Sequence, residues 1–169
     1  KKEAEKTIKL LANYKNKITM PVAFDWEFNS NNRDLTRTAA TKNGKELNTR
    51  ICSTYCDMIK EAGYTPMIYS SASVFTGYLN RDTLYSKYKI WVAHYTGGKA
   101  TDYSKPMYMW QFSSSAKFSQ NGRSLTGNTS VVDINYLFIK KTGQWVAFAN
   151  GKYKYKEDGV FLKSQWLTL

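Results

Sequence analysis

The chain has 169 residues, 42% of them hydrophobic, which suits one domain with a sizeable core, or one domain plus a small appendage. Its 25 basic and 13 acidic residues give a formal net charge of +12, which indicates an anionic partner such as nucleic acid, anionic lipid or an acidic cell-wall polymer. The two cysteines, Cys52 and Cys56, fit neither a zinc pattern nor a disulfide framework, and a thiol pair in the core is expected. We also expect no membrane-spanning segment and no signal peptide.

Helices and strands are predicted to alternate through the first part of the chain. An amphipathic helix opens it and runs to about Lys17, and a strand follows at residues 21–28. After a polar loop at residues 29–33, a helix is predicted at 44–62, with Gly63 as its stop. The expected buried stripe of that helix consists of Leu47, Ile51, Tyr55, Met58 and Ala62.

The following segments continue this alternation and then lose it. A strand is predicted at residues 65–70, a short helix at 72–79 and a strand at 89–95. Two further β-rich runs, at 107–112 and 130–136, leave little room for a helix between them. The order predicts an α/β fold, an irregular TIM-like barrel of strands and helices whose last part has lost its helices.

The strand at residues 21–28 ends in two carboxylates, Asp25 and Glu27. Its nearly continuous apolar sequence predicts burial on both faces, as in a parallel sheet covered by helices. Because side chains alternate along a strand, both acids point to the same face, at the end where α/β barrels carry their chemistry. Two carboxylates this close raise one pKa, as a glycosidase acid requires. Taken alone, the pair could equally cap a helix, bind a cation or face water.

The composition changes after Lys141. Two alternating runs, at residues 145–149 and 152–156, are joined by Asn150-Gly151, which is a strong signal for a β-hairpin. A lone hairpin is marginally stable in water, so this tail either packs on the barrel or belongs to an array of hairpins. We therefore expect a domain at residues 1–141 and a hairpin unit at 142–169.

The first domain contains five sequence blocks, in chain order PVAFDWEF, GYTPMIYSS, YKIWVAHY, MYMWQF and VVDINYLF. Together they resemble the glycoside hydrolase family 25 lysozymes, which cleave the link between muramic acid and glucosamine in peptidoglycan. Each block stands at a predicted strand end, and together they cover roughly residues 7–140. The resemblance implies a barrel fold and muramidase activity with no metal or organic cofactor.

The same resemblance implies roles for individual residues. Glu27 matches the proton donor, Asp25 the acid beside it, and Asp133 a third acidic residue of the active site. Residues expected to line the sugar groove are Tyr69, Tyr95, Trp110, Gln111 and Asn135. Tyr69 and Trp110 could also be plain core aromatics. His94, the only histidine, is expected to be structural, because this chemistry uses carboxylates.

The family begins with a strand carrying Asp-x-Ser, followed by further strands and helices that this sequence does not contain. We therefore expect a barrel without its first strands, which exposes sheet edges and favours self-association. Those strands either belong to the natural protein outside this chain or are replaced by another copy. The expected domain at residues 1–141 is then an incomplete catalytic domain.

The tail resembles the choline-binding or cell-wall-binding repeats of Gram-positive surface proteins and phage lysins. Such repeats bind ligands in aromatic cages through cation–π contacts. The aromatic residues that fit this role are Trp145, Tyr153, Tyr155 and Trp166. A capping hairpin without a ligand is the alternative, because a complete cage needs a neighbouring repeat.

The sequence as a whole is interpreted as a secreted or phage-delivered muramidase that acts on the cell wall. Expected partners are peptidoglycan strands and choline or anionic wall polymers, with neither nucleic acid nor membrane. Whether the reaction retains or inverts configuration depends on the separation of the carboxylates. Two alternatives remain: a non-catalytic wall-binding protein, and a basic nucleic-acid-binding protein, which is disfavoured because the lysines are scattered and no nucleic-acid motif is present.

Overall fold

The computed structural model describes residues 1–28, 35–97, 99–117, 119–120, 123–124, 131–138, 143–147, 153–157 and 160–161. They belong to two compact units, Lys1–Leu137 and Phe138–Leu169, which are described separately. The polar loop predicted at residues 29–33 lies outside the described residues.

A five-stranded sheet forms the centre of the first unit. In spatial order its strands are β1 (Val22–Asp25), β2 (Pro66–Ser71), β3 (Lys89–Ala93), β4 (Met109–Ala116) and β7 (Val132–Leu137). Strands β1 to β4 are parallel, and β7 is antiparallel to β4. The curled sheet corresponds to part of a barrel, so the predicted α/β class is confirmed.

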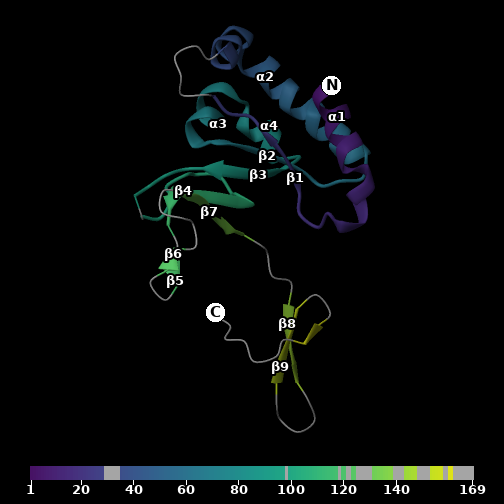
Figure 1. The fold of residues 1–169 in the computed structure, drawn as a ribbon, viewed down its shortest axis with the longest axis vertical. Coiled ribbons are helices and arrows are strands. Elements are labelled where there is room, and N and C mark those ends of the chain that lie inside the picture. Colours follow the sequence, from purple (N-terminus) through teal and green to yellow (C-terminus); the bar gives the residue numbers. More distant parts are fainter. Residues whose placement is uncertain are drawn as a thin grey trace. The chain divides into compact units, whose positions relative to one another are not determined.

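Helices cover one face of β1 to β3 (Figure 1). They are α1 (Lys2–Leu11), α2 (Leu35–Glu61), α3 (Ala72–Tyr78) and α4 (Arg81–Tyr85). A 3₁₀ helix at Ala12–Lys17 continues α1, so the opening helical segment ends where the sequence predicts. The short α4 was not predicted, because five residues give too little periodicity to recognise.

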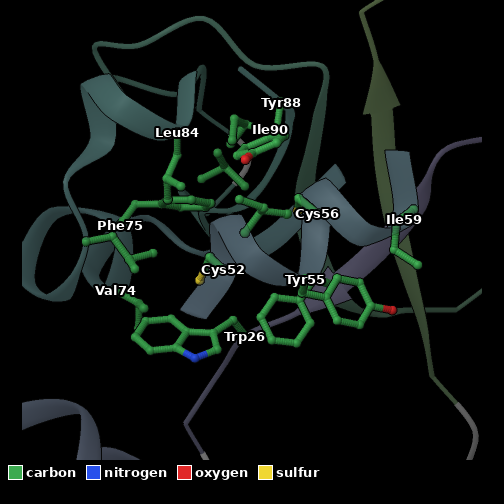
Figure 2. Close-up of a cluster of buried hydrophobic side chains, with 14 of the residues drawn as sticks. Trp26, Cys52, Tyr55, Cys56, Ile59, Val74, Phe75, Leu84, Tyr88 and Ile90 are labelled. Carbon is green, nitrogen blue, oxygen red and sulfur yellow. The ribbon is translucent and has the colours of Figure 1, made fainter. Parts of the chain in front are cut away.

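The core lies between these helices and the sheet. Phe24, Ile68 and Ile90 enter it from the strands, and Cys52 and Cys56 enter it from α2. Figure 2 shows both cysteines beside the aromatic and aliphatic side chains of the core. Both thiols are buried and unpaired, which confirms the predicted thiol pair, and burial raises the pKa of Cys52 to about 12.

The buried face of α2 differs from the predicted stripe. Ile51 is 40% exposed, whereas Asn48, Cys52 and Ile59 are fully buried. Asn48 uses its Nδ2 to donate to the backbone oxygens of Ala40 at 2.8 Å and of Tyr78 in α3 at 3.2 Å. The prediction of Ile51 as a core residue is therefore wrong, because apolar spacing ignores small and polar residues that fit a tight interface.

Strand β1 is covered on one face only. Phe24 on the helix side is 6% exposed, but Val22 and Ala23 are half-buried and Asp25 is exposed. The prediction of burial on both faces is wrong for this strand, because the helices pack on a single face of the sheet. The opposite face of the sheet is left for polar and aromatic side chains.

The remaining strands are short and antiparallel. Strands β5 (Ser119–Gln120) and β6 (Arg123–Ser124) form one pair. In the second unit, β8 (Gly143–Ala147), β9 (Tyr153–Glu157) and β10 (Val160–Phe161) form a three-stranded sheet in the order β10-β9-β8. Within the described residues, the helices are all too short or too polar to span a membrane.

The contrast between Ile59 and Ile51 gives a test of how α2 is oriented. We expect Ile59→Ala to lower the free energy of unfolding by about 2–5 kcal/mol, because it leaves a cavity in a closed core. Ile51→Ala on the same helix is expected to cost about 1 kcal/mol or less. Urea unfolding of both variants provides the measurement. Equal losses would contradict the assigned buried face.

Candidate active site

The carboxyl end of β1 separates aromatic and acidic side chains onto opposite faces. Trp26 is 8% exposed and belongs to the core, and Phe28 packs against it with the ring centroids 5.4 Å apart. Tyr78 of α3 meets Phe28 edge to face at 4.8 Å. Asp25 and Glu27 alternate with these rings and are exposed, so anchoring of the two rings fixes where the two carboxylates point.

Backbone pairing with β2 continues beyond the last residue of β1. Asp25 is in register with Tyr69, and the backbone nitrogen of Trp26 donates to the backbone oxygen of Tyr69 at 3.0 Å. The buried Ser70 hydroxyl donates to the backbone oxygen of Trp26 at 2.6 Å. These bonds hold the peptide between the two acids. The sequence analysis did not identify Ser70, because a small hydroxyl residue in a strand gives no positional signal.

The environment raises the pKa values of both acids. Partial burial raises the pKa of Asp25 above its ordinary value. For Glu27 partial burial is the first cause, and the negative charges of Asp25 and Asp133 raise its pKa further. Both side chains still reach solvent, so hydration is lost only in part. A carboxyl group that keeps its proton to higher pH beside other carboxylates can act as a general acid.

A buried amide links two tyrosines on the same face of the sheet. Gln111 of β4 is 2% exposed, and its Oε1 accepts hydrogen bonds from the hydroxyls of Tyr69 at 2.8 Å and Tyr95 at 2.6 Å. Burial is the first cause that raises the pKa of Tyr69, and negative charge from Tyr95, Glu27 and Asp25 adds to it. The two hydroxyls are thus held by one amide on this face, and Tyr95 remains 54% exposed.

A second amide occupies the neighbouring position of the sheet. Asn135 of β7 is in register with Gln111, and its Oδ1 accepts a hydrogen bond from Nε1 of Trp91 at 2.7 Å. The Trp91 ring packs on Tyr69 with centroids 4.6 Å apart. Asp133 precedes Asn135 by two residues and is exposed. The sequence analysis missed Trp91, although its register with Tyr69 in parallel strands could have identified it.

Trp110 and His94 lie apart from the face that carries the acids and Gln111. Trp110 is in register with Val92, which belongs to the core on the opposite face from Gln111, and it is 8% exposed. Its Nε1 donates to the backbone oxygen of His94 at 2.8 Å. The Nδ1 of His94 hydrogen-bonds with the hydroxyl of Thr101 at 2.8 Å. The structure therefore separates Trp110 from the other residues predicted to line the groove, and its indole N–H is already used inside the protein.

The tail residues lie in the second unit. Its backbone register pairs Trp145 with Tyr155 and Ala147 with Tyr153. Trp166 lies outside the described residues. Across the residues that the structure does describe, His, Cys, Asp and Glu side chains nowhere gather in threes that could hold a metal ion.

The structure thus collects on one face a carboxyl group with a raised pKa, neighbouring carboxylates, an exposed tyrosine, the buried amide of Gln111 and the half-buried amide of Asn135. Acids supply proton transfer and charge stabilisation, and aromatic and amide groups suit a sugar. This set of groups can cleave a glycosidic bond.

A model described as glycosyl hydrolases family 25 matches residues 1–121. A family 25 glycosyl hydrolase from Bacillus anthracis is 19% identical, with a TM-score of 0.53 over 72% of this chain and 51% of that one. The CTP1L endolysin is 19% identical, with a TM-score of 0.50 over 80% of this chain and 41% of that one. The modular Cpl-1 endolysin, complexed with a peptidoglycan analogue, is 19% identical, with a TM-score of 0.47 over 99% of this chain and 46% of that one. None of the curated proteins matches.

The chain spans between 41% and 51% of these three structures. At 19% identity, the Bacillus anthracis and CTP1L structures show a shared fold. The family model, in contrast, covers well over half of the 169 residues and includes the strand that carries both acids. The chain therefore belongs to family 25 of the glycosyl hydrolases.

Proposed function

We propose that this protein is a muramidase, a peptidoglycan hydrolase that cleaves the β-1,4 bond between N-acetylmuramic acid and N-acetylglucosamine. The observation that carries the proposal is the placement of Glu27 beside Asp25 and Asp133 at the end of β1, where partial burial and the two carboxylates raise its pKa. Membership of family 25 supports the same activity. The endolysin that was solved with a peptidoglycan analogue names the substrate class.

In the proposed mechanism Glu27 is the general acid. It gives its proton to the glycosidic oxygen as the bond from that oxygen to the anomeric carbon breaks. Asp25 and Asp133 stabilise the positive charge that develops at the anomeric carbon, or orient the acetamido group of the substrate. Water then adds to the anomeric carbon, and Glu27 recovers its proton. Tyr95, which is exposed and held by Gln111, packs against a sugar ring.

The proposal assigns residues 1–141 to catalysis and 142–169 to a wall-binding hairpin repeat. The pairing of Trp145 with Tyr155 across β8 and β9 supports a repeat with aromatic residues on neighbouring strands. Such a repeat would bind choline or another wall group through Trp145, Tyr153, Tyr155 and Trp166. The enzyme then acts outside the cytoplasm on the cell wall, either as a secreted protein or delivered by a phage.

The first test of the proposal is Glu27→Gln, which removes the proton donor but keeps the shape of the side chain. We expect the release of new reducing ends from Gram-positive cell walls to fall about 100-fold or more. Glu5→Gln on α1 is the matched control, because it makes the same chemical change at an exposed position and is expected to leave the rate unchanged. Wild-type and variant rates would be compared by reducing-end assay and mass spectrometry of the fragments.

Equal rates for wild type and Glu27→Gln would overturn the assignment of Glu27. A wild-type chain that binds walls but releases no reducing ends would instead support the non-catalytic wall-binding alternative. Fragments ending in muramic acid distinguish a muramidase from an enzyme that cuts the other glycosidic bond.

A second test concerns the cause of the raised pKa of Glu27. Because the negative charge of Asp25 contributes to it, Asp25→Asn is expected to lower the pKa of Glu27, which stays above its ordinary value since partial burial is the first cause. A general acid works below its pKa, so activity falls as pH rises through that value. The activity of Asp25→Asn is therefore expected to fall at a lower pH than the activity of the wild type. NMR titration of the Glu27 carboxyl carbon measures the pKa without any need for activity.

Asp82→Asn is the control for this titration. The Asp82 carboxylate of α4 is held by Lys105 at 2.6 Å, and its removal is expected to leave the pKa of Glu27 unchanged. An unchanged Glu27 pKa in Asp25→Asn would contradict the coupling of the two acids.

A further inference from the structure

A pocket of about 520 Å³ lies at the end of the sheet opposite to the acids. Pro66 and Lys89, the first residues of the parallel strands β2 and β3, contribute to its wall, whereas Asp25 is the last residue of β1. Asp25 is in register with Tyr69, three residues after Pro66, so the acid lies about 10 Å further along the sheet at roughly 3.3 Å per residue, and none of the acids lines the pocket. The pocket is therefore a separate concavity of the first unit and not an extension of the acidic site.

The lining of the pocket is basic. Lys60, Lys87 and Lys89 contribute to it, and none of its lining residues is acidic. Lys60 and Lys87 are exposed, and in the described part of the chain neither forms an ion pair. Two carboxylates adjoin lining residues: Asp57 accepts a hydrogen bond from a lining tyrosine, and Glu61 follows Lys60 in the chain. Three lysines in the lining of one concavity favour a ligand with repeated negative charge.

Two lysines are held in place before any ligand binds. Nζ of Lys89 lies 3.5 Å from the centroid of the Tyr108 ring. Nζ of Lys15 donates to the backbone oxygen of Ala62 at 2.8 Å and lies 5.6 Å from the centroid of the Tyr64 ring, which lines the pocket. Of these two lysines only Lys89 lines the pocket, and because it is already ordered it loses less conformational entropy on binding.

The aromatic lining is fixed from inside the protein. Tyr64 and Tyr88 are each 8% exposed, and the hydroxyl of Tyr88 donates to Oδ1 of Asp57 at 2.7 Å. The hydroxyl of Tyr85 donates to the hydroxyl of Tyr103 at 2.6 Å. Tyr64 and Tyr88 therefore expose little surface on which a ligand ring could stack. A nucleic-acid base needs an open ring face for stacking, whereas a short flexible polyol unit does not.

We propose that this pocket binds a phosphate-bearing polyol polymer of the cell wall, with lysines contacting phosphates and tyrosines contacting the polyol carbons. Phosphate suits compact ammonium groups, which act as point charges. The inference rests on the proposed function for its location at the wall. It adds a second site, which holds the enzyme on a polymer that it does not cut.

The test measures binding of fluorescein-labelled poly(glycerol phosphate) by fluorescence anisotropy, using the whole chain. Lys60→Gln with Lys87→Gln is expected to weaken binding about tenfold or more. The matched control is Lys2→Gln with Lys9→Gln on α1, which removes the same charge from exposed positions and is expected to change binding less than about twofold. Equal weakening by both double variants would overturn the proposal, because it would show attraction by net charge alone.

Two more measurements complete the test. Lys60→Arg with Lys87→Arg keeps the charge and is expected to keep binding, which separates lost charge from a folding defect. Loss of binding in a folded Arg variant would count against the pocket.

A DNA oligonucleotide with the same number of phosphates is expected to bind more weakly. If it binds as tightly and shows the same sensitivity to Lys60 and Lys87, the pocket is a nucleic-acid site and the proposal is wrong.

The binding measurement is independent of catalysis. A chain that binds the polymer through Lys60 and Lys87 but cuts no peptidoglycan would overturn the proposed function and leave the pocket assignment in place. A chain that cuts peptidoglycan while its polymer binding is unaffected by the two substitutions would overturn the pocket assignment alone.

Discussion

The arrangement of the candidate site depends on the burial of two aromatic rings at the end of β1. Trp26 and Phe28 are drawn to the helix side of the sheet by packing, and strand alternation then turns Asp25 and Glu27 to the other side. Ser70 and the backbone of Tyr69 fix the peptide that joins the acids. The orientation of the acids therefore follows from the hydrophobic core and does not require bonds to the carboxylates themselves.

On the face opposite the core, hydrogen bonds fix several side chains, whereas the acidic groups lower the stability of the fold. Gln111 and Asn135 use their side-chain oxygens to fix Tyr69, Tyr95 and Trp91. The raised pKa of Glu27 means that the folded chain binds this proton more tightly than the unfolded chain does. Stability is then lost as pH rises from the ordinary glutamate pKa through the raised one, so the acid is maintained at the expense of stability.

The sequence predicted the features that follow from side-chain alternation and from the order of the elements. It did not predict the features that depend on how side chains fit together in three dimensions. Period-two alternation in parallel strands placed Asp25 and Glu27 on one face, and the α/β class followed from the order of the elements. The register of β4 with β7 shifts on either side of Ser113, and no residue pattern announces such irregularities. The buried face of α2 includes small residues such as Cys52, which apolar spacing does not identify. The role of Ser70 depends on the backbone oxygen of Trp26 beside it, and the sequence does not show that contact.

The sheet also separates charge between its two ends, and this bears on how a basic protein can act on an anionic wall. The carboxylates lie at the carboxyl end of β1, whereas lysines surround the pocket at the amino ends of β2 and β3. A polymer attracted to the net charge of +12 would compete with the glycan if the lysines surrounded the acids. The proposed binding at the far end would avoid that competition and would raise the local concentration of neighbouring glycan, because a wall polymer and its peptidoglycan are joined in one network. Screening by salt weakens the attraction between exposed charges more than it weakens the contacts of partly buried ones, so such a tether would act most strongly at low ionic strength.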